Sequence, residues 1–440
     1  MRVLLINRND FVDGGADRVF VNTVEMLQVA SCNPDLSGLQ RATCNVQPAT
    51  FTRSSAGLAS TPDPRSLSFW GKLKAARSYL YNKQVATELD KKIKEFKPDV
   101  AHIHLIFGTL SGAVLRVLKR HRIPVVMTLH DYRLICPANA MLDRHGKVCE
   151  KCRGSHYCHS LIHRCSEGNV FFSAVIMIEA YLRKWFFKPL KNVDRFIFVS
   201  EFARDKHVGF DKRYSQKSSL LYNMTEETPE TAPVRGDYLL YFGRLSKEKG
   251  LLTLIEAVKE QDIKLLIAGS GPQEEELRRQ ETRDERPRDQ ETKGPRDQET
   301  TDNRQLITDN HQNHHNIKLV GYHSGAALEA LIRNCSFVVL PSEWYENNPM
   351  SVVEAFALGK PVIASRIGGI PELVTAETGF LFEPGNPASL SEAIKKANNL
   401  TEGAYREMSI NCRTFALKNF NREQHLQELM RIYEQAIHRA

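Results

Sequence analysis

Short apolar runs alternate with segments of helical spacing along almost the whole chain, and this pattern constrains the fold most. The runs lie at 3–6, 99–104, 124–130 and 195–200 in the first half and at 238–242, 264–268, 317–322, 337–340 and 362–365 in the second. Buried strands that alternate with helices are typical of a parallel sheet covered by helices on both faces. The sequence therefore predicts an α/β protein with doubly wound sheets.

A polar linker divides the alternating pattern. Residues 225–236 contain Pro229 and Pro233 and lack an apolar run, which is typical of a domain boundary. We predict a first domain over 1–224, the linker over 225–236, and a second domain over 237–420 that is followed by a last helix over 421–440. A chain of 440 residues is long enough for two or three hydrophobic cores.

Two segments interrupt the alternation. Residues 31–68 are rich in Ser, Thr, Pro and Gly, and we expect a partly ordered loop near the cleft. Residues 278–315 contain an eight-residue near-duplication, Pro287 to Gly294 followed by Pro295 to Asp302, that has no apolar side chain. Such a segment cannot bury enough surface to offset its chain entropy, so we predict a disordered insertion without a function of its own. A partner-binding arm is the alternative.

The charge balance limits the class of partner. The chain has 60 basic and 52 acidic side chains, a net charge of +8, which suits a polyanionic ligand or an anionic membrane surface but is too small to indicate nucleic acid. The N-terminus enters an apolar run without a signal-peptide pattern, and the apolar segment from Val170 to Ile178 is too short to span a bilayer. These features predict a cytoplasmic protein, whose nine cysteines would be mostly reduced or metal-bound.

The stretch from Phe337 to Pro361 has the pattern of a binding site. A buried strand ends at Pro341-Ser342, and a helix is expected to follow, with Asn348 as its cap and Pro349 in its first turn. The amides near Met350 and Ser351 would then face the carboxyl edge of the sheet, where a helix N-terminus favours an anion such as a pyrophosphate. Two carboxylates flank this point, Glu346 before the helix and Glu354 within it.

The spacing of Glu346 and Glu354, with seven residues between them, resembles the signature of retaining glycosyltransferases of the GT-B type, family 4 (glycosyl transferases group 1). This resemblance implies two Rossmann-like domains that face a cleft, with the nucleotide-sugar donor held mainly by the second domain and the acceptor by the first. It implies that Glu354 holds ribose hydroxyls and that Glu346 holds a sugar hydroxyl. The last helix would cross back over the first domain.

Other positions match the same family pattern. Arg244 offers a planar fork and Lys249 a point charge, two complementary ways to neutralise phosphate. The resemblance gives His130 a contact to the transferred sugar, places Gly14 and Gly15 over the donor phosphates, and uses the end of the strand at Tyr322 for contacts to the base. The predicted catalytic residues are His130, Glu346, Arg244 and Lys249. The predicted donor-binding residues are Gly14, Gly15, Arg244, Lys249, Tyr322, Asn348, Met350, Ser351 and Glu354.

The chain contains no Asp-x-Asp sequence, the motif that holds a metal in the other large glycosyltransferase fold. We therefore expect phosphate neutralisation by side chains and a helix dipole, with no cofactor for catalysis. The resemblance implies a retaining hexosyltransferase (EC 2.4) in polysaccharide or glycoconjugate synthesis, with a glycan or a lipid-linked acceptor. The alternatives are a non-catalytic nucleotide-sugar-binding protein and an epimerase or phosphorylase of the same fold.

A cysteine-rich insertion at 136–165 departs from the family pattern. Cys149 and Cys152 form one C-x-x-C knuckle, and with Cys158 and Cys165 they would complete a tetrahedral site suited to structural zinc. Free thiols, a redox role and an iron-sulfur cluster remain alternatives.

The segment 171–190 joins aromatic and aliphatic residues to several basic ones. It is consistent with an interfacial helix that reaches a lipid-linked acceptor at the inner face of a membrane. A packed helix with a basic exposed face is the more common arrangement, and we favour it.

Overall fold

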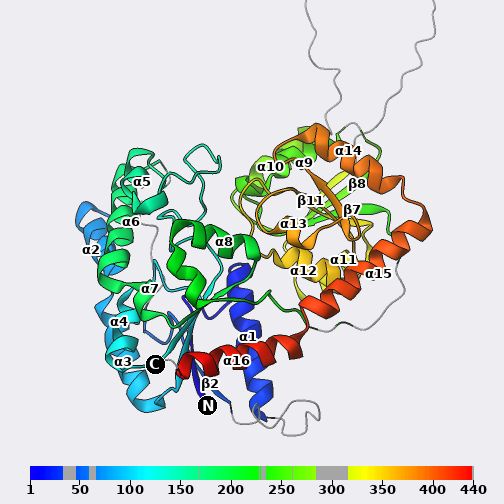
Figure 1. The fold of residues 1–440 in the computed structure, drawn as a ribbon. Helices are drawn as coiled ribbons and strands as arrows, with labels where there is room; N and C mark the ends of the chain where they lie inside the picture. Colours follow the sequence, from blue (N-terminus) through cyan, green and yellow to red (C-terminus); the bar gives the residue numbers. More distant parts are fainter. Residues whose placement is uncertain are drawn as a thin grey trace, which may run out of the picture.

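Two parallel six-stranded sheets organise the molecule. The computed structural model describes residues 1–32, 46–58, 66–166, 168–226, 228, 234–259, 261–283 and 316–438. The first sheet has the order β2-β1-β3-β4-β5-β6 and the second the order β12-β11-β10-β7-β8-β9. Every strand pair in both sheets is parallel, so the predicted doubly wound α/β class is confirmed (Figure 1). The strands are β1 (Arg2–Ile6), β2 (Gln47–Phe51), β3 (Val100–Ile103), β4 (Val125–Leu129), β5 (Arg195–Phe198), β6 (Ser218–Leu220), β7 (Tyr238–Phe242), β8 (Lys264–Ala268), β9 (Ile317–Gly321), β10 (Phe337–Leu340), β11 (Val362–Ser365) and β12 (Gly379–Phe382).

Helices connect the strands and cover the faces of the sheets (Figure 1). The α-helices are α1 (Gly15–Cys32), α2 (Phe69–Leu80), α3 (Lys83–Phe96), α4 (Ala113–Arg120), α5 (Cys158–Ile162), α6 (Val170–Leu182), α7 (Pro189–Asn192), α8 (Glu201–Phe210), α9 (Leu251–Val258), α10 (Glu274–Arg283), α11 (Gly325–Asn334), α12 (Met350–Ala357), α13 (Ile370–Leu373), α14 (Pro387–Asn398), α15 (Glu402–Asn419) and α16 (Arg422–Ile437). Shorter turns are the π-helix η3 (Arg183–Phe187) and the 3-10 helices η2 (Arg153–Ser155), η4 (Lys212–Lys217) and η5 (Lys247–Lys249).

Each sheet is buried on both faces. In β1, Leu4 and Ile6 pack in one hydrophobic cluster and Val3 and Leu5 in another. Strand β7 divides in the same way, with Leu239 and Tyr241 on one side and Leu240 and Phe242 on the other. Because successive side chains of a strand point to opposite faces, this division explains why the strands read as continuous apolar runs instead of alternating ones.

The last helix returns to the first sheet. Helix α16 contacts β3, β4 and α1, and in Figure 1 it lies beside the N-terminal half of the molecule. The hydroxyl of Tyr433 on this helix lies 2.7 Å from Nδ1 of His102 on β3, and both side chains are buried. The two halves are therefore joined by packed chain beyond the single linker, although the exact domain limits remain predictions.

Three expectations from the sequence need correction. Strand β2 lies within the stretch 31–68, which was predicted to be a loop, and pairs with β1. Helix α10 continues to Arg283, so the start of the predicted insertion at 278–315 is helical; its remainder, 284–315, lies outside the described residues. Helix α12 begins at Met350 with Pro349 at its N-cap and no side-chain cap, so Asn348 is not the cap.

In the part of the chain that the structure describes, no helix has the length and apolar character that crossing a bilayer requires.

Candidate active site

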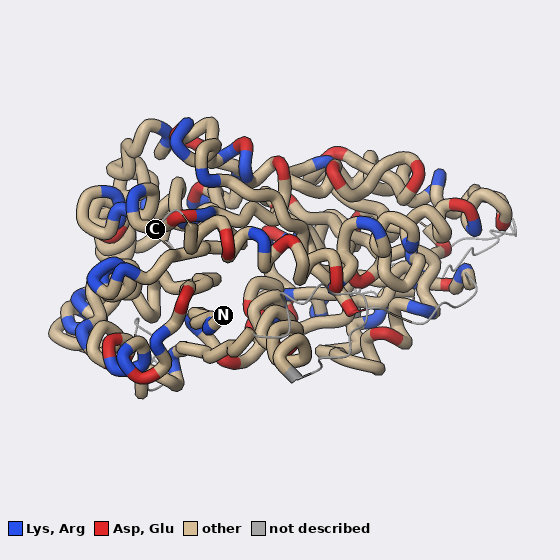
Figure 2. The backbone as a smooth tube through the Cα atoms, turned by 60° about the horizontal axis from the view of Figure 1, so that its bottom comes forward, with Lys and Arg blue, Asp and Glu red and all other residues tan. Residues whose placement is uncertain are grey.

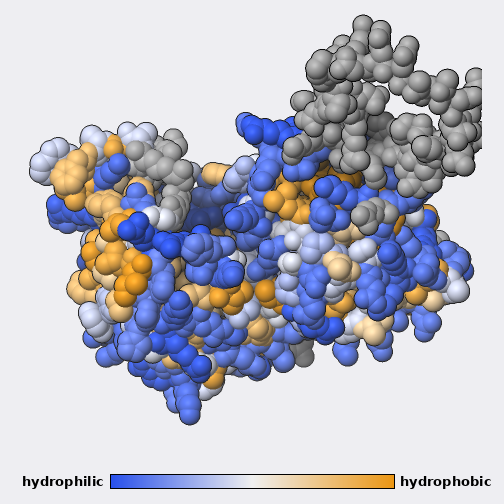
Figure 3. Space-filling view, turned by 90° about the horizontal axis from the view of Figure 1, so that it is seen from above, coloured by the Kyte–Doolittle hydropathy of each residue, from blue (hydrophilic) through white to orange (hydrophobic). Residues whose placement is uncertain are grey.

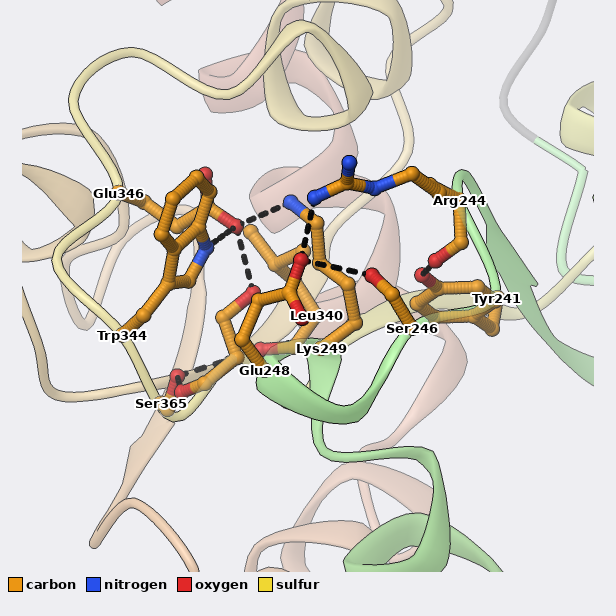
Figure 4. Close-up of polar contacts among 10 residues, drawn as sticks. Tyr241, Arg244, Ser246, Glu248, Lys249, Leu340, Trp344, Glu346 and Ser365 are labelled. Carbon is orange, nitrogen blue, oxygen red and sulfur yellow. Dashed lines mark hydrogen bonds and ion pairs between the residues drawn. The ribbon is translucent and has the colours of Figure 1, made fainter. Parts of the chain in front are cut away.

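The candidate site forms where β7 and β10 end. These strands are neighbours in the second sheet, so the turn after β7 and the loop after β10 emerge side by side at its carboxyl edge. Figure 4 shows Arg244, Ser246 and Lys249 from the turn facing Trp344 and Glu346 from the loop. This edge is the usual ligand position in open α/β sheets.

Glu346 and Lys249 form the centre of the site. The Nζ atom of Lys249 donates to Oε1 of Glu346 at 2.5 Å, and the same oxygen accepts hydrogen bonds from Ser342 Oγ at 2.7 Å and Trp344 Nε1 at 2.8 Å. The side chain of Glu346 is only 8% exposed and that of Lys249 17%. The Lys249 ammonium also lies 5.2 Å from the centre of the Trp344 ring, which favours a fixed cation at this point.

The electrostatics of the pair keep Glu346 ionised. Burial opposes its negative charge, but Lys249 and the donors Ser342 and Trp344 outweigh this effect and hold the pKa of Glu346 below its ordinary value. Three donors, one of them the Lys249 ammonium, fix the carboxylate of Glu346. The charge pair is therefore preorganised and needs little rearrangement when a ligand binds.

Arg244 lies at the open side of the same turn. Its guanidinium pairs with Glu248, which also accepts a hydrogen bond from Ser246 Oγ at 2.8 Å. The Tyr241 hydroxyl donates to the Arg244 carbonyl at 2.8 Å and so supports the turn from below (Figure 4). Because 57% of the Arg244 side chain is exposed, its fork can turn toward an anion in the cleft.

The second predicted carboxylate lies at the junction of two helices. Glu354 on α12 is paired with Arg18 on α1, with 3.3 Å between Oε1 and Nε, and burial raises its pKa against the pull of Arg18. The start of α1 reaches α12, because a Cβ placed on Gly15 would meet Met350 Cγ at 3.7 Å. The structure therefore brings Gly15, Met350 and Glu354 together.

His130 lies opposite the loop that carries Glu346. Its carbonyl accepts a hydrogen bond from Asn347 Nδ2 at 2.8 Å, and its Nε2 lies 2.9 Å from Nδ1 of His104. Burial lowers the pKa of His130 to about 4 and that of His104 well below its ordinary value. Both rings are therefore neutral at pH 7, and they line one cavity with Arg8, Asp131 and Arg133.

The other predicted donor residues are less closely gathered. Oδ1 of Asn348 accepts from the Asn223 amide at 3.0 Å, and its carbonyl accepts from Asn223 Nδ2 at 2.8 Å, so it joins the two halves instead of capping α12. Tyr322 follows β9 and is 66% exposed. Ser351 lies in the first turn of α12, and Gly14 has open space beside it.

Several residues of the site were missed from the sequence. Ser342, Trp344 and Asn347 lie on the same loop as Glu346, and Glu248 lies in the basic turn, so proximity to the predicted residues could have identified them. His104 follows β3 as His130 follows β4, and the same strand-end argument applies to it. Glu372, which accepts hydrogen bonds from the Glu201 and Phe202 amides across the two halves, left no comparable signal.

The predicted zinc ligands are not assembled as expected. Cys158 is exposed, and its thiol donates to the His156 carbonyl. The cysteines that line one small cavity are Cys136, Cys149, Cys152 and Cys165. Among the described residues, no three His, Cys, Asp or Glu side chains are placed to share a metal ion, so the predicted zinc site, with Cys158 as a ligand, finds no support in the structure.

Family models match the two halves in succession. Residues 36–225 match the model for Glycosyltransferase Family 4, and residues 225–414 match the model for Glycosyl transferases group 1. The chain belongs to glycosyltransferase family 4.

Individual relatives of this family 4 protein are distant. It is 27% identical to an uncharacterised glycosyltransferase of Methanocaldococcus jannaschii over 60% of its own length and 66% of the relative, a little less than two thirds. It is 23% identical to TuaC of Bacillus subtilis, a protein named for teichuronic acid biosynthesis, over 74% of its own length and 68% of the relative. The crystal structure of HepE from Anabaena, solved with UDP and glucose, matches with a TM-score of 0.60 at 17% identity over 98% of both chains, which shows the shared GT-B fold.

Proposed function

We propose that this family 4 protein transfers a sugar from a nucleotide-diphosphate sugar to a glycan or lipid-linked acceptor with retention of configuration, as a hexosyltransferase of class EC 2.4. The observation that carries the proposal is the buried Glu346–Lys249 pair at the carboxyl edge of the second sheet, with Glu346 on the loop whose Asn347 donates to the His130 carbonyl of the first half. The names of relatives support a role in polysaccharide or glycoconjugate synthesis, because TuaC is named for teichuronic acid biosynthesis.

The proposed roles follow from the charges of the site. Lys249, Arg244 and the amides at Met350 and Ser351 would hold the donor pyrophosphate, where negative charge grows as the sugar leaves. Glu346 would accept a sugar hydroxyl and Glu354 the ribose hydroxyls. The remaining donor contacts in the proposal are Gly14, Gly15, Tyr322 and Asn348.

The chemistry proposed is attack on the front face of the sugar. A donor phosphate oxygen takes the proton of the acceptor hydroxyl as the new glycosidic bond forms and the bond to the phosphate breaks. The neutral His130 can contact a sugar hydroxyl without competing for that proton, because its pKa of about 4 makes it a weak base at pH 7. No cofactor takes part in these steps.

The acceptor is proposed to enter through the cavity beside His130. This cavity is lined by Arg8, His104, Asp131 and Arg133 from the first half, and Nε2 of His104 is buried without a hydrogen-bond partner. A polar acceptor hydroxyl would satisfy that nitrogen. We propose a cytoplasmic enzyme that works peripherally at the inner face of a membrane.

The first prediction tests donor binding and stereochemistry together. Of a panel of nucleotide sugars, one donor is expected to raise the unfolding temperature, and the protein with an acceptor extract should convert it to a product with the same anomeric configuration, as measured by NMR. Added Mg²⁺ should leave the rate unchanged, because no metal ion takes part in the proposed transfer. An inverted linkage would reject front-face attack, isomerisation of the donor alone would favour an epimerase, and binding without any conversion would favour a non-catalytic donor-binding protein.

The proposal also includes a structural metal, with a ligand set that differs from the one predicted from the sequence. We propose Cys136, Cys149, Cys152 and Cys165, because these thiols line one cavity and four thiolates suit zinc or iron. The sulfurs would have to close in by side-chain rotation, since no three described ligands are placed to share an ion.

The second prediction follows from this ligand set. The purified protein should contain about one equivalent of zinc or iron, and Cys136→Ser should lose the metal and lower the unfolding temperature. Cys158→Ser should keep both, because Cys158 is exposed outside the cavity. The metal site would be rejected if the purified protein contained no metal and Cys136→Ser had the unfolding temperature of the wild type; the four cysteines would then be free thiols.

A further inference from the structure

Helix α2 contributes nothing to the hydrophobic core. None of its residues is buried, and its main packing partner is α6. Its open side carries Phe69, Trp70 and Leu73, which are 66%, 77% and 39% exposed. Helices that bury no side chain gain little from tertiary packing, so the exposed aromatic residues call for another source of burial.

The neighbouring helix adds to the same apolar surface. Tyr81 at the end of α2 stacks on Phe187 at the end of η3, with 6.4 Å between ring centres, so the two segments end side by side. On α6 and η3, Ile178 and Trp185 are 43% and 62% exposed, and α6 is the helix against which α2 packs. We call Phe69, Trp70, Leu73, Ile178 and Trp185 the aromatic face.

Basic residues accompany the aromatic face. The sequence of α2 contains Lys72, Lys74 and Arg77 and no acidic residue. From Val170 to Asn192 the only acidic residue is Glu179, which is buried and paired with Arg183. The exposed lysines on this side are Lys184, Lys188 and Lys191. Lys and Arg positions are frequent along the backbone at this end of the molecule (Figure 2), and apolar residues gather there as well (Figure 3).

We propose that the aromatic face docks on a bilayer that contains anionic lipids. Trp and Phe beside lysines are the side chains that bury at the boundary between headgroups and acyl chains, and the basic residues complement anionic headgroups. No described helix could span the bilayer, so the contact is peripheral. Helix α6 is packed, with Ser173, Ile176 and Ala180 buried, as the preferred interpretation of 171–190 expects, and the proposal adds a bilayer contact on its exposed side.

Helix α2, which carries part of the aromatic face, also contacts the proposed acceptor cavity near its other end. The Arg133 guanidinium donates to the Tyr79 hydroxyl on α2 at 2.8 Å, and Arg133 lines the cavity that holds His130. A headgroup at the membrane surface would therefore approach the cavity from the docked side. Only this link to a lipid-linked acceptor rests on the proposed function; the docking itself does not.

Vesicle sedimentation of the full-length protein tests the proposal. The protein is expected to bind phosphatidylglycerol–phosphatidylcholine vesicles and to bind pure phosphatidylcholine at least about tenfold more weakly, with the difference reduced at high salt. Phe69→Ser/Trp70→Ser should lower binding at least about tenfold. The matched control is Ile410→Ser/Leu417→Ser, two exposed apolar residues of α15, which should bind as wild type.

The results distinguish a bilayer from other partners that could cover the aromatic face. Equal binding by the two double variants, or no binding of the wild type to anionic vesicles, would overturn the proposal. A dimer in light scattering that Phe69→Ser/Trp70→Ser dissolves would also overturn it, because a second copy would then cover the face. Donor hydrolysis in solution should be the same in both variants, so a failure of docking can be told from a failure of the proposed transfer.

Discussion

Replacement of Lys249 by alanine is expected to lower kcat/KM for sugar transfer by about 10²–10³-fold. This is the size of effect seen when one preorganised stabiliser of developing charge is removed, and Lys249 is the cation held in place by both Glu346 and the Trp344 ring. The measurement is steady-state transfer with the donor found in the screen. Lys259→Ala, which removes an exposed lysine of the same half, should have the activity of the wild type.

The same substitution should also destabilise the protein. It leaves the buried carboxylate of Glu346 without its cation, and breaking a buried ion pair in this way costs about 3–5 kcal/mol of stability. We expect a loss at the lower end of this range, because Ser342 and Trp344 still donate hydrogen bonds to the carboxylate. The double variant Lys249→Ala/Glu346→Gln should recover stability in urea unfolding without recovering transfer. If Lys249→Ala transfers sugar at the wild-type rate, the proposed role of the pair is wrong.

The sequence was informative where one physical cause dominates. Runs such as Phe337–Leu340 predict buried parallel strands because both faces of the sheet are covered. Arg244, Lys249 and Glu346 were connected through the family resemblance, and the structure brings them together because β7 and β10 are neighbours. Strand β2, with the sequence Gln-Pro-Ala-Thr-Phe, was missed because its burial comes from pairing with β1 at the sheet margin and not from its own composition.

Contacts between distant segments were the least predictable. Asn is a common helix-capping residue, yet both oxygens of Asn348 accept hydrogen bonds from Asn223. Asn223 lies in the first half, so the local sequence around Asn348 does not reveal this partner. Cys158 has suitable spacing for a metal ligand, but it is exposed and does not line the cavity that Cys136 shares with the other thiols. Spacing along the chain limits which residues can meet without deciding which do.

Gly368→Ala is expected to remove most of the transfer activity and to lower the free energy of unfolding. Gly368 has a φ of +64°, and a Cβ there would lie 2.3 Å from the carbonyl oxygen and 2.7 Å from the amide nitrogen of Glu346. The left-handed conformation alone costs an alanine about 1–2 kcal/mol. The clash must in addition displace the backbone of Glu346, which accepts a hydrogen bond from the Gly369 amide at 2.7 Å.

The consequence for catalysis follows from that displacement. A shift of about 1 Å in a positioned group can cost about 100-fold in rate, so kcat should fall by at least that factor. Gly146→Ala is the matched control: its φ is +79°, but nothing lies within 4 Å of the added Cβ, so it should lose only the conformational 1–2 kcal/mol and keep its activity. Urea unfolding and transfer assays could instead show equally mild effects of the two substitutions. The loop that carries Glu346 would then tolerate movement, and catalysis would not require its fixed geometry.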